Sequence, residues 1–247
     1  MIIIATFSMQ CITGMPLKFA GAAWTFPVAR FWGGAFMMGR MHRISGLTMI
    51  AFVVYHLLYV IVVTVVKARK MYRKYPSESF GDGALKLLKM IYNLPFIPRG
   101  IDGRNIADFV KYSLFLSNKG PQYPKWIWKE KFEYIAFLAG GVIIMSTGLM
   151  LFFPTVTATI LPSRSLNIAW IIHTNEAMLA MAVIFIWHFY HAIFAPEKFP
   201  ADGTVIDGVI SEHHMIDEHV LEYKRIILEG PDHVGLVKTR PGHGSHH

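Results

Sequence analysis

Four apolar stretches constrain the fold of this chain more than any other feature of its sequence. They cover residues 1–17, 44–66, 135–153 and 166–194, and Glu176 is the one charged residue within them. A helix needs roughly 20 mostly apolar residues to cross the hydrocarbon core of a bilayer. The pattern therefore predicts an all-α membrane protein, a bundle of four transmembrane helices.

The charge distribution favours a membrane topology over a nucleic-acid surface. The chain is 53% hydrophobic and 16% charged, which is too apolar for an ordinary soluble domain. Fourteen of its Lys and Arg residues lie in the segment 67–131, whereas Arg164 is the one basic residue of the segment 154–165. Under the positive-inside rule, the long loop and both termini are expected in the cytoplasm. Residues 18–43 and 154–165 are then expected on the other side.

The sequence predicts one membrane domain, residues 1–195, and a polar cytoplasmic tail, residues 196–247. We expect a short helix at 85–92 in the long loop, an amphipathic helix at 211–228, and a mobile end after Pro231. No internal sequence repeat is visible. The first apolar stretch has two other interpretations, a cleaved signal peptide and a helix that starts upstream of Met1. The missing basic flank argues against the signal peptide.

Histidines inside the apolar stretches are the main functional signal, because ionisable groups in a membrane are costly and mark functional paths. His42 and His56 are 14 residues apart, and His173 and His188 are 15 apart, which is roughly 21 and 22 Å along a helix. The two helices that carry them run in the same direction, so His42 can face His173 and His56 can face His188. The spacing predicts two bis-histidine haems, stacked across the bilayer. His191 is a competing ligand to His188.

Other residues narrow the choice of cofactor. The single Cys11 excludes an intrachain disulfide, a cysteine-ligated iron–sulfur cluster and covalent attachment of a c-type haem. Zinc would need three or four ligands at one level. Arg40 and Arg43 are candidates for binding haem propionates, or else interfacial anchors. Glu176 is a hydrogen-bond partner or a proton-handling group. Glycines in the helices can admit a macrocycle or a neighbouring helix; these are Gly46, Gly140, Gly141 and Gly148.

Several segments resemble the prokaryotic di-haem cytochrome b family. That family includes the membrane gamma subunit of respiratory formate dehydrogenases and the cytochrome b subunits of thiosulfate reductases and hydrogenases. The segments that carry the resemblance are Gly39-Arg40-Met41-His42-Arg43, Tyr55-His56, Lys129-Glu130-Lys131-Phe132-Glu133-Tyr134, Ile172-His173 and Trp187-His188-Phe189-Tyr190-His191.

The resemblance implies an outer haem on His42 and His173 and an inner haem on His188. In the formate dehydrogenase branch the other inner ligand comes from the start of the first helix, but no histidine precedes His42 here. His56 fills that place geometrically. The family also implies a quinone pocket, for menaquinone or ubiquinone, near the inner haem. Its expected lining residues are His191, Lys131 and Glu133.

The leading functional hypothesis is an electron-transfer subunit in a bacterial or archaeal cytoplasmic membrane. It would connect the quinone pool with an iron–sulfur or multihaem cytochrome c subunit of a respiratory oxidoreductase complex. The alternatives are a stand-alone ferric-type reductase and a haem-free membrane anchor. The tail is expected to dock a partner, or else to bind a metal through Glu212, His213, His214, Asp217 and His219.

Overall fold

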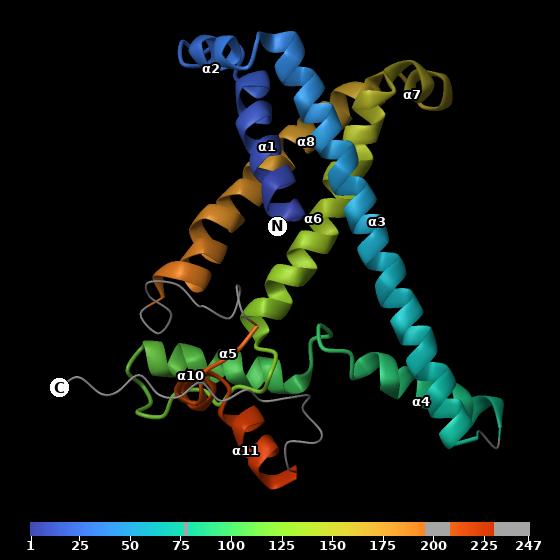
Figure 1. Ribbon diagram of the computed structural model, residues 1–247, viewed down its shortest axis with the longest axis vertical. Coiled ribbons are helices and arrows are strands. Elements are labelled where there is room, and N and C mark those ends of the chain that lie inside the picture. The colour runs from blue at the N-terminus through green and yellow to red at the C-terminus, as the bar shows by residue number, and fades with distance from the viewer. Residues whose placement is uncertain (77–78, 196–207, 230–247) are drawn as a thin grey trace. The chain divides into compact units, whose positions relative to one another are not determined.

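The computed structural model describes residues 1–76, 79–195 and 208–229, and every regular element in these ranges is a helix (Figure 1). The helical fold class is therefore confirmed. The elements are α1 (Ile2–Lys18), α2 (Thr25–Phe31), α3 (Ala35–Lys74), α4 (Phe80–Tyr92), α5 (Gly100–Ser113), α6 (Trp128–Phe152), α7 (Pro154–Ile160), α8 (Arg164–Ala182), the π-helical segments η1 (Val183–His188) and η2 (Tyr190–Phe194), α10 (Glu212–Glu218) and α11 (Val220–Glu229).

Three helices of the described chain are long and apolar enough to span a membrane. They are Ala35–Lys74, Trp128–Phe152 and Arg164–Phe194, the last of which combines α8, η1 and η2. These spans contain three of the four predicted stretches, except for Phe153, which follows the end of α6. The remaining stretch, residues 1–17, forms α1, an apolar helix of 17 residues. This helix is shorter than the roughly 20 residues of an ordinary span.

The long helices extend beyond their apolar stretches. Helix α3 begins at Ala35, directly after Gly34, whose φ of 97° is a left-handed conformation that suits glycine. The apolar stretch from residue 44 had predicted His42 at the start of this helix. In the structure His42 lies seven residues after the first residue of α3. At the other end α3 continues to Lys74, because Lys, Arg and Met are good helix formers and no proline occurs between Ala35 and Pro76.

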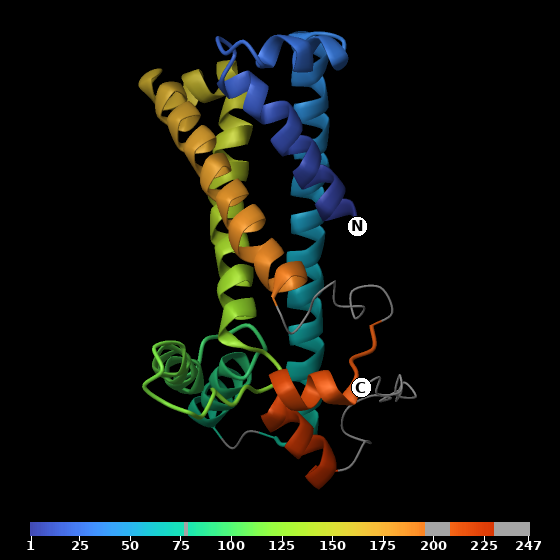
Figure 2. The same cartoon turned by 90° about the vertical axis from the view of Figure 1, so that its left-hand side faces the viewer.

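The chain divides into two compact units, residues 1–90 with 137–183, and residues 91–136 with 184–247. In the first unit α1 packs against α2, α3 and α8, and α7 packs against α8. The pairing of α1 with α3 is visible from two directions (Figures 1 and 2).

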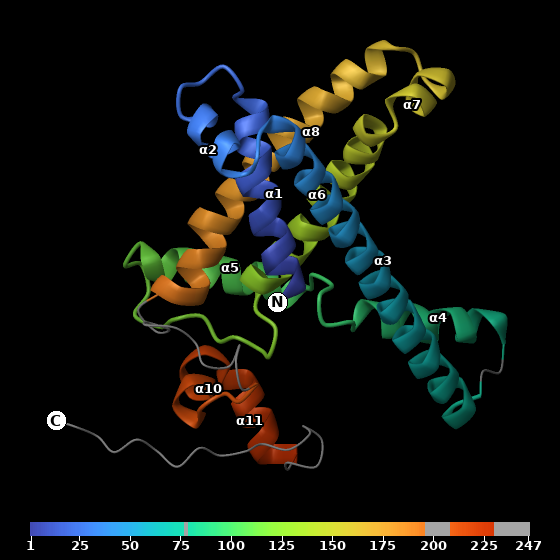
Figure 3. The ribbon, with the colours of Figure 1, turned by 45° about the horizontal axis from the view of Figure 1, so that its top comes forward.

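The first unit contains an arrangement that is not apparent as a sequence repeat. A helix, a seven-residue helix and a second helix follow one another twice, as α1–α2–α3 and as α6–α7–α8. Figure 3 shows α2 and α7 at the two corresponding turns. The two arrangements also place corresponding contacts around His42 and His173.

Few apolar side chains are buried in the described residues. In the first unit the buried ones include Met38, Met49, Val53 and Ala169, while many others on the spans are exposed, such as Ile44 and Ile61. Lipid is as apolar as these side chains, so membrane helices gain little by burying them against each other. The exposed apolar surface is consistent with a membrane protein.

The structure of the long loop and of the tail differs from the prediction. Helix α4 begins at Phe80 and not at residue 85, and the long loop contains a further helix, α5. The tail helix predicted at 211–228 is two helices, α10 and α11, which are interrupted at His219. The Nδ1 of His219 donates to the Pro124 carbonyl at 3.0 Å. Residues 196–207 and 230–247 of the predicted tail lie outside the described residues.

Candidate functional site

His42 of α3 and His173 of α8 lie opposite each other, as the sequence predicts. Their ring centroids are 6.3 Å apart and the two ring planes are nearly perpendicular, at 81°. Both side chains are partly buried within the first unit. Two histidines from helices far apart in the sequence thus form one site.

The Nδ1 atom of His42 is bound by a threonine of α1. The hydroxyl of Thr13, a fully buried residue, lies 3.0 Å from this Nδ1. The same hydroxyl donates its proton to the Met9 carbonyl at 2.5 Å. It can therefore only accept from the ring, so Nδ1 of His42 carries the proton and Nε2 carries the lone pair.

His173 has the same surroundings on α6. Its Nδ1 lies 3.2 Å from the hydroxyl of Thr147 and 2.9 Å from the carbonyl of Ile144. Thr147 donates its own proton to the Ile143 carbonyl at 2.7 Å. The tautomer of His173 is thus the same as that of His42. This is the tautomer of metal-ligating histidines, in which the second ring nitrogen donates to a fixed oxygen.

A glycine follows each threonine and makes room for each ring. A Cβ on Gly14 would lie 3.1 Å from Cε1 of His42, and a Cβ on Gly148 would lie 3.1 Å from Cε1 of His173. Gly148 was predicted to make room for a macrocycle or a neighbouring helix. In the structure it makes room for the ring of His173 on the neighbouring helix α8. The Thr–Gly pair occurs twice, at the same place in each helix–short helix–helix arrangement.

Two polar side chains approach glycines near this site. A Cβ on Gly46 would lie 2.8 Å from Nε2 of Gln10, which donates to the His42 carbonyl at 3.0 Å. Similarly, a Cβ on Gly140 would lie 2.5 Å from Oε1 of Glu176. Glu176 therefore lies against α6 at Gly140, a position compatible with both predicted roles, a hydrogen-bond partner and a proton-handling group.

The candidate propionate-binding arginines lie beside aromatic rings. The guanidinium of Arg40 lies 5.9 Å from the centroid of Phe36, and that of Arg43 lies 5.9 Å from the centroid of Phe152 on α6. Both arginines are exposed. Cation–π contact of this kind is compatible with carboxylate binding at the edge of the guanidinium group.

The remaining candidate ligands are divided between the two units. His56 belongs to the first unit, and His188 and His191 belong to the second, so the pairing of His56 with His188 stays a prediction. The estimate of roughly 22 Å between His173 and His188 assumed a regular α-helix. The helix is π-helical over Val183–His188, with wider turns, so that estimate does not apply to it.

Glu133 contacts His188 directly. Its Oε2 lies 2.8 Å from Nδ1 of His188, whose side chain is 45% exposed. The Nδ1 of His191 donates to the Trp187 carbonyl at 2.9 Å, and its ring lies 4.5 Å from the Trp187 indole. A carboxylate that accepts from one ring nitrogen orients the other one for metal binding. Both histidines thus have Nδ1 beside a fixed oxygen, a carboxylate for His188 and a backbone carbonyl for His191.

Lys131, a candidate quinone-lining residue, forms a buried ion pair. Its Nζ lies 2.9 and 2.8 Å from the two carboxylate oxygens of Asp102 on α5. Lys131 is 1% exposed and Asp102 5% exposed. This position favours a structural link between α5 and α6 over contact with a quinone. Sequence reasoning missed Asp102, because α5 itself was not predicted.

Across the ranges that the structure describes, no group of three or more His, Cys, Asp and Glu side chains could hold a metal ion. In the tail, His213 pairs with Asp217 at 3.0 Å and His214 pairs with Glu218 at 3.1 Å. These are contacts within one helix turn.

No protein-family model, curated protein or solved structure matches the chain.

The geometry of His42 and His173 fits a bis-histidine metal site. Two imidazoles that bind one metal from opposite sides, each with a metal–nitrogen distance of about 2.0 Å, have ring centres about 6 Å apart. The observed 6.3 Å agrees with this separation. A protein site with two imidazoles and no further side-chain ligand suits an iron whose other ligands come from a porphyrin.

Proposed function

We propose that this chain is the cytochrome b subunit of a respiratory oxidoreductase complex. It carries electrons across a membrane between a quinone and a redox partner protein. On this proposal it is a member of the prokaryotic di-haem cytochrome b family, and its four apolar helices form a bundle around two b haems.

One observation carries the proposal. His42 and His173 are 131 positions apart in the sequence, yet the centroids of their rings lie 6.3 Å apart. Each ring has a threonine hydroxyl beside its Nδ1 and a glycine that leaves room for its Cε1. A pair of histidines that only linked two helices would not need the same tautomer and the same glycine gap on both sides.

A bound haem supplies reversible one-electron chemistry, and the protein holds and orients it. On this proposal His42 and His173 bind the iron of the outer haem through Nε2. Thr13 and Thr147 fix the tautomer and the orientation of the rings. Arg40 and Arg43 bind the propionates, for which two parallel donors of a guanidinium are well suited.

The second haem and the quinone are assigned from the sequence, with support from the second unit. We retain His56 and His188 as the ligands of the inner haem. The Glu133 carboxylate beside Nδ1 supports His188 in that role. His191 and Glu133 are proposed to exchange protons with the quinone. Lys131 forms a buried ion pair with Asp102, and we therefore do not include it among the proposed quinone contacts.

The proposed partner and location rest on charge, cysteine content and the family resemblance. The basic segment 67–131 supports a cytoplasmic position for that loop and for both termini, and the resemblance supports a bacterial or archaeal membrane. Cys11 is the one cysteine, so an iron–sulfur cluster or c-type haem has to come from a partner subunit.

Reduction by a quinol tests the proposal. The purified chain, in lipid nanodiscs without oxygen, is mixed with a menaquinol or ubiquinol analogue while the visible spectrum is recorded. We expect reduced b-type bands to appear, and His191→Ala to slow their appearance about tenfold or more. His213→Ala is the matched control, because this side chain is 90% exposed in the tail. A chain that carries haem but accepts no electrons from either quinol would contradict the quinone function.

A further inference from the structure

Helix α4, which follows the first long span, has an apolar face without cover in the described residues. Phe80, Leu85 and Leu88 are 95%, 51% and 62% exposed. Leu85 and Leu88 are three residues apart and so lie on one face of the helix. Asp82 and Lys86 contact each other and are only partly exposed. The helix is thus amphipathic, with its apolar side outward.

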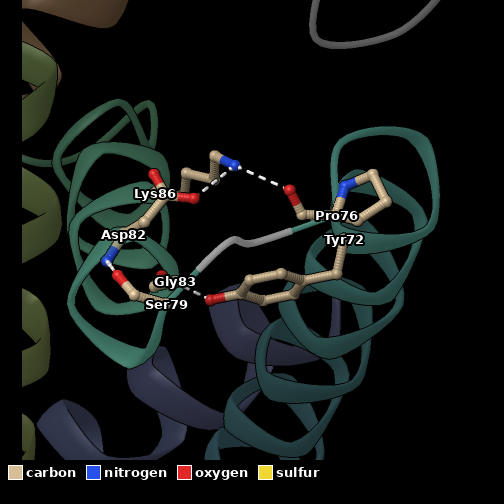
Figure 4. Close-up of polar contacts among 6 residues, drawn as sticks. All are labelled: Tyr72, Pro76, Ser79, Asp82, Gly83 and Lys86. Carbon is tan, nitrogen blue, oxygen red and sulfur yellow. Dashed lines mark hydrogen bonds and ion pairs between the residues drawn. The ribbon is translucent and has the colours of Figure 1, made fainter.

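Polar contacts hold α4 to the end of α3 (Figure 4). The Tyr72 hydroxyl donates to the Gly83 carbonyl at 2.5 Å. Lys86 donates to the Pro76 carbonyl at 3.2 Å and pairs with Asp82 at 2.7 Å. The polar side of α4 thus contacts the end of α3 and the residues that follow it. The apolar side is exposed although the helix is fixed in place by these contacts.

The surroundings of this apolar face are strongly basic. The last two turns of α3 lead directly to α4 and carry a run of cationic side chains, and Lys89 adds another on α4 itself. The residues of the run are Lys67, Arg69, Lys70, Arg73 and Lys74. A helix with exposed Phe and Leu on one side and basic residues around it matches helices that lie in the headgroup region of a membrane. Such basic segments at the end of a span attract anionic lipids.

We propose that α4 lies in the plane of the membrane surface and inserts Phe80, Leu85 and Leu88 among anionic phospholipids. The Tyr72–Gly83 and Lys86–Pro76 contacts set the angle between the spanning helix and this surface helix. The inference rests on the membrane placement of α3 in the proposed function, but it does not depend on haem or quinone.

Spin labels on α4 test the insertion. In the full chain with Cys11→Ser, a nitroxide is attached at Leu88→Cys or, as the matched control, at Lys89→Cys. The protein is placed in bilayers of phosphatidylcholine alone or mixed with phosphatidylglycerol. Collisions with oxygen, which prefers lipid, and with a nickel chelate, which stays in water, are measured for each label. Hydrogen exchange of α4 in the unlabelled chain gives a second measure that needs no substitution.

We expect the label at position 88 to meet oxygen several-fold more often, relative to the chelate, than the label at position 89. The difference should grow with phosphatidylglycerol, and so should protection of the α4 amides. Equal chelate access at both positions, with no effect of the anionic lipid, would overturn the proposal. Strong dipolar coupling between labels at position 88 would also overturn it, because a second copy of the chain would then cover this face. The haem content of the same samples reports separately on the proposed function.

Discussion

At the scale of single residues, the site depends on two threonine–histidine contacts that sequence patterns do not reveal. Thr13 and Thr147 look like ordinary helix residues in the sequence, since each donates to a backbone carbonyl one turn before it. Only the fold brings them to Nδ1 of His42 and His173. The histidines could be predicted because they are rare and costly in apolar helices. Their threonine partners could not, because a threonine in a helix has many uses.

Removal of either hydroxyl should change the redox potential of the site and leave haem bound. In Thr13→Val the ring of His42 loses the acceptor for its Nδ1–H, so the imidazole becomes a poorer donor to ferric iron. In Thr147→Val the Ile144 carbonyl, 2.9 Å from Nδ1 of His173, still accepts this proton, so the shift should be smaller. A hydrogen bond contributes about 1 kcal/mol, which for one electron is about 40 mV. We expect the potential of one haem to rise by up to about 40 mV in a spectroelectrochemical titration.

Thr159→Val is the control for these variants, because Thr159 is exposed on α7 and donates only to the Val156 carbonyl. Its potentials should equal those of the unaltered chain. If the Thr13 and Thr147 variants gave no shift either, the hydroxyls would not act on a metal ligand.

Gly148→Ala should disturb the ring of His173. Its Cβ would lie 3.1 Å from Cε1, closer than ordinary contact, so the ring or the helix has to shift. Overpacking of this kind costs about 1–3 kcal/mol. We expect less haem per chain and a changed ferric spectrum. Gly141→Ala on the same helix would meet only the flexible end of Met145 at 3.7 Å, and it should bind haem normally.

At the scale of elements, the ion pair between Lys131 of α6 and Asp102 of α5 is a buried polar link within the second unit. Lys131 and Asp102 have side-chain exposures of 2% and 7%. Loss of one partner leaves an uncompensated buried charge, which costs about 3–5 kcal/mol. We expect Lys131→Met to lower the midpoint of thermal unfolding clearly, and Lys131→Met with Asp102→Leu to recover much of the loss.

Lys86→Met provides the comparison. The Lys86–Asp82 pair is slightly closer, at 2.7 Å, but its side chains are 29% and 35% exposed. Exposed pairs contribute about 0–1 kcal/mol, so this variant should unfold near the normal temperature. An equal, small effect of both lysine variants would show that the buried pair is not a structural link.

The helices themselves were predictable where apolar residues run without interruption. Three spans agree with the stretches from 44, 135 and 166, because apolar length alone decides them. The boundaries were less predictable, since α3 continues through basic residues that favour a helix as much as leucine does. Helix α5 was missed because its glycines and charges resemble a loop, and the π-helical turns of η1 leave no mark in the residue pattern.

At the scale of the whole molecule, the candidate site connects two similar halves of the first unit. Helices α1 and α3 contribute Thr13, Gly14 and His42, and helices α6 and α8 contribute Thr147, Gly148 and His173. The proposed haem between His42 and His173 would give both halves the same reason to hold a histidine in this way. On this account each half is incomplete alone, and loss of either histidine should remove the same haem.

The central claim is tested most directly by counting haem. Pyridine haemochrome analysis is made per chain on the purified protein and on His42→Ala, His173→Ala and the tail control His213→Ala. The account predicts two b haems in the unaltered chain and in the control, and one in each of the first two variants. Absence of haem from the unaltered chain, or an undiminished content in both His42→Ala and His173→Ala, would contradict it.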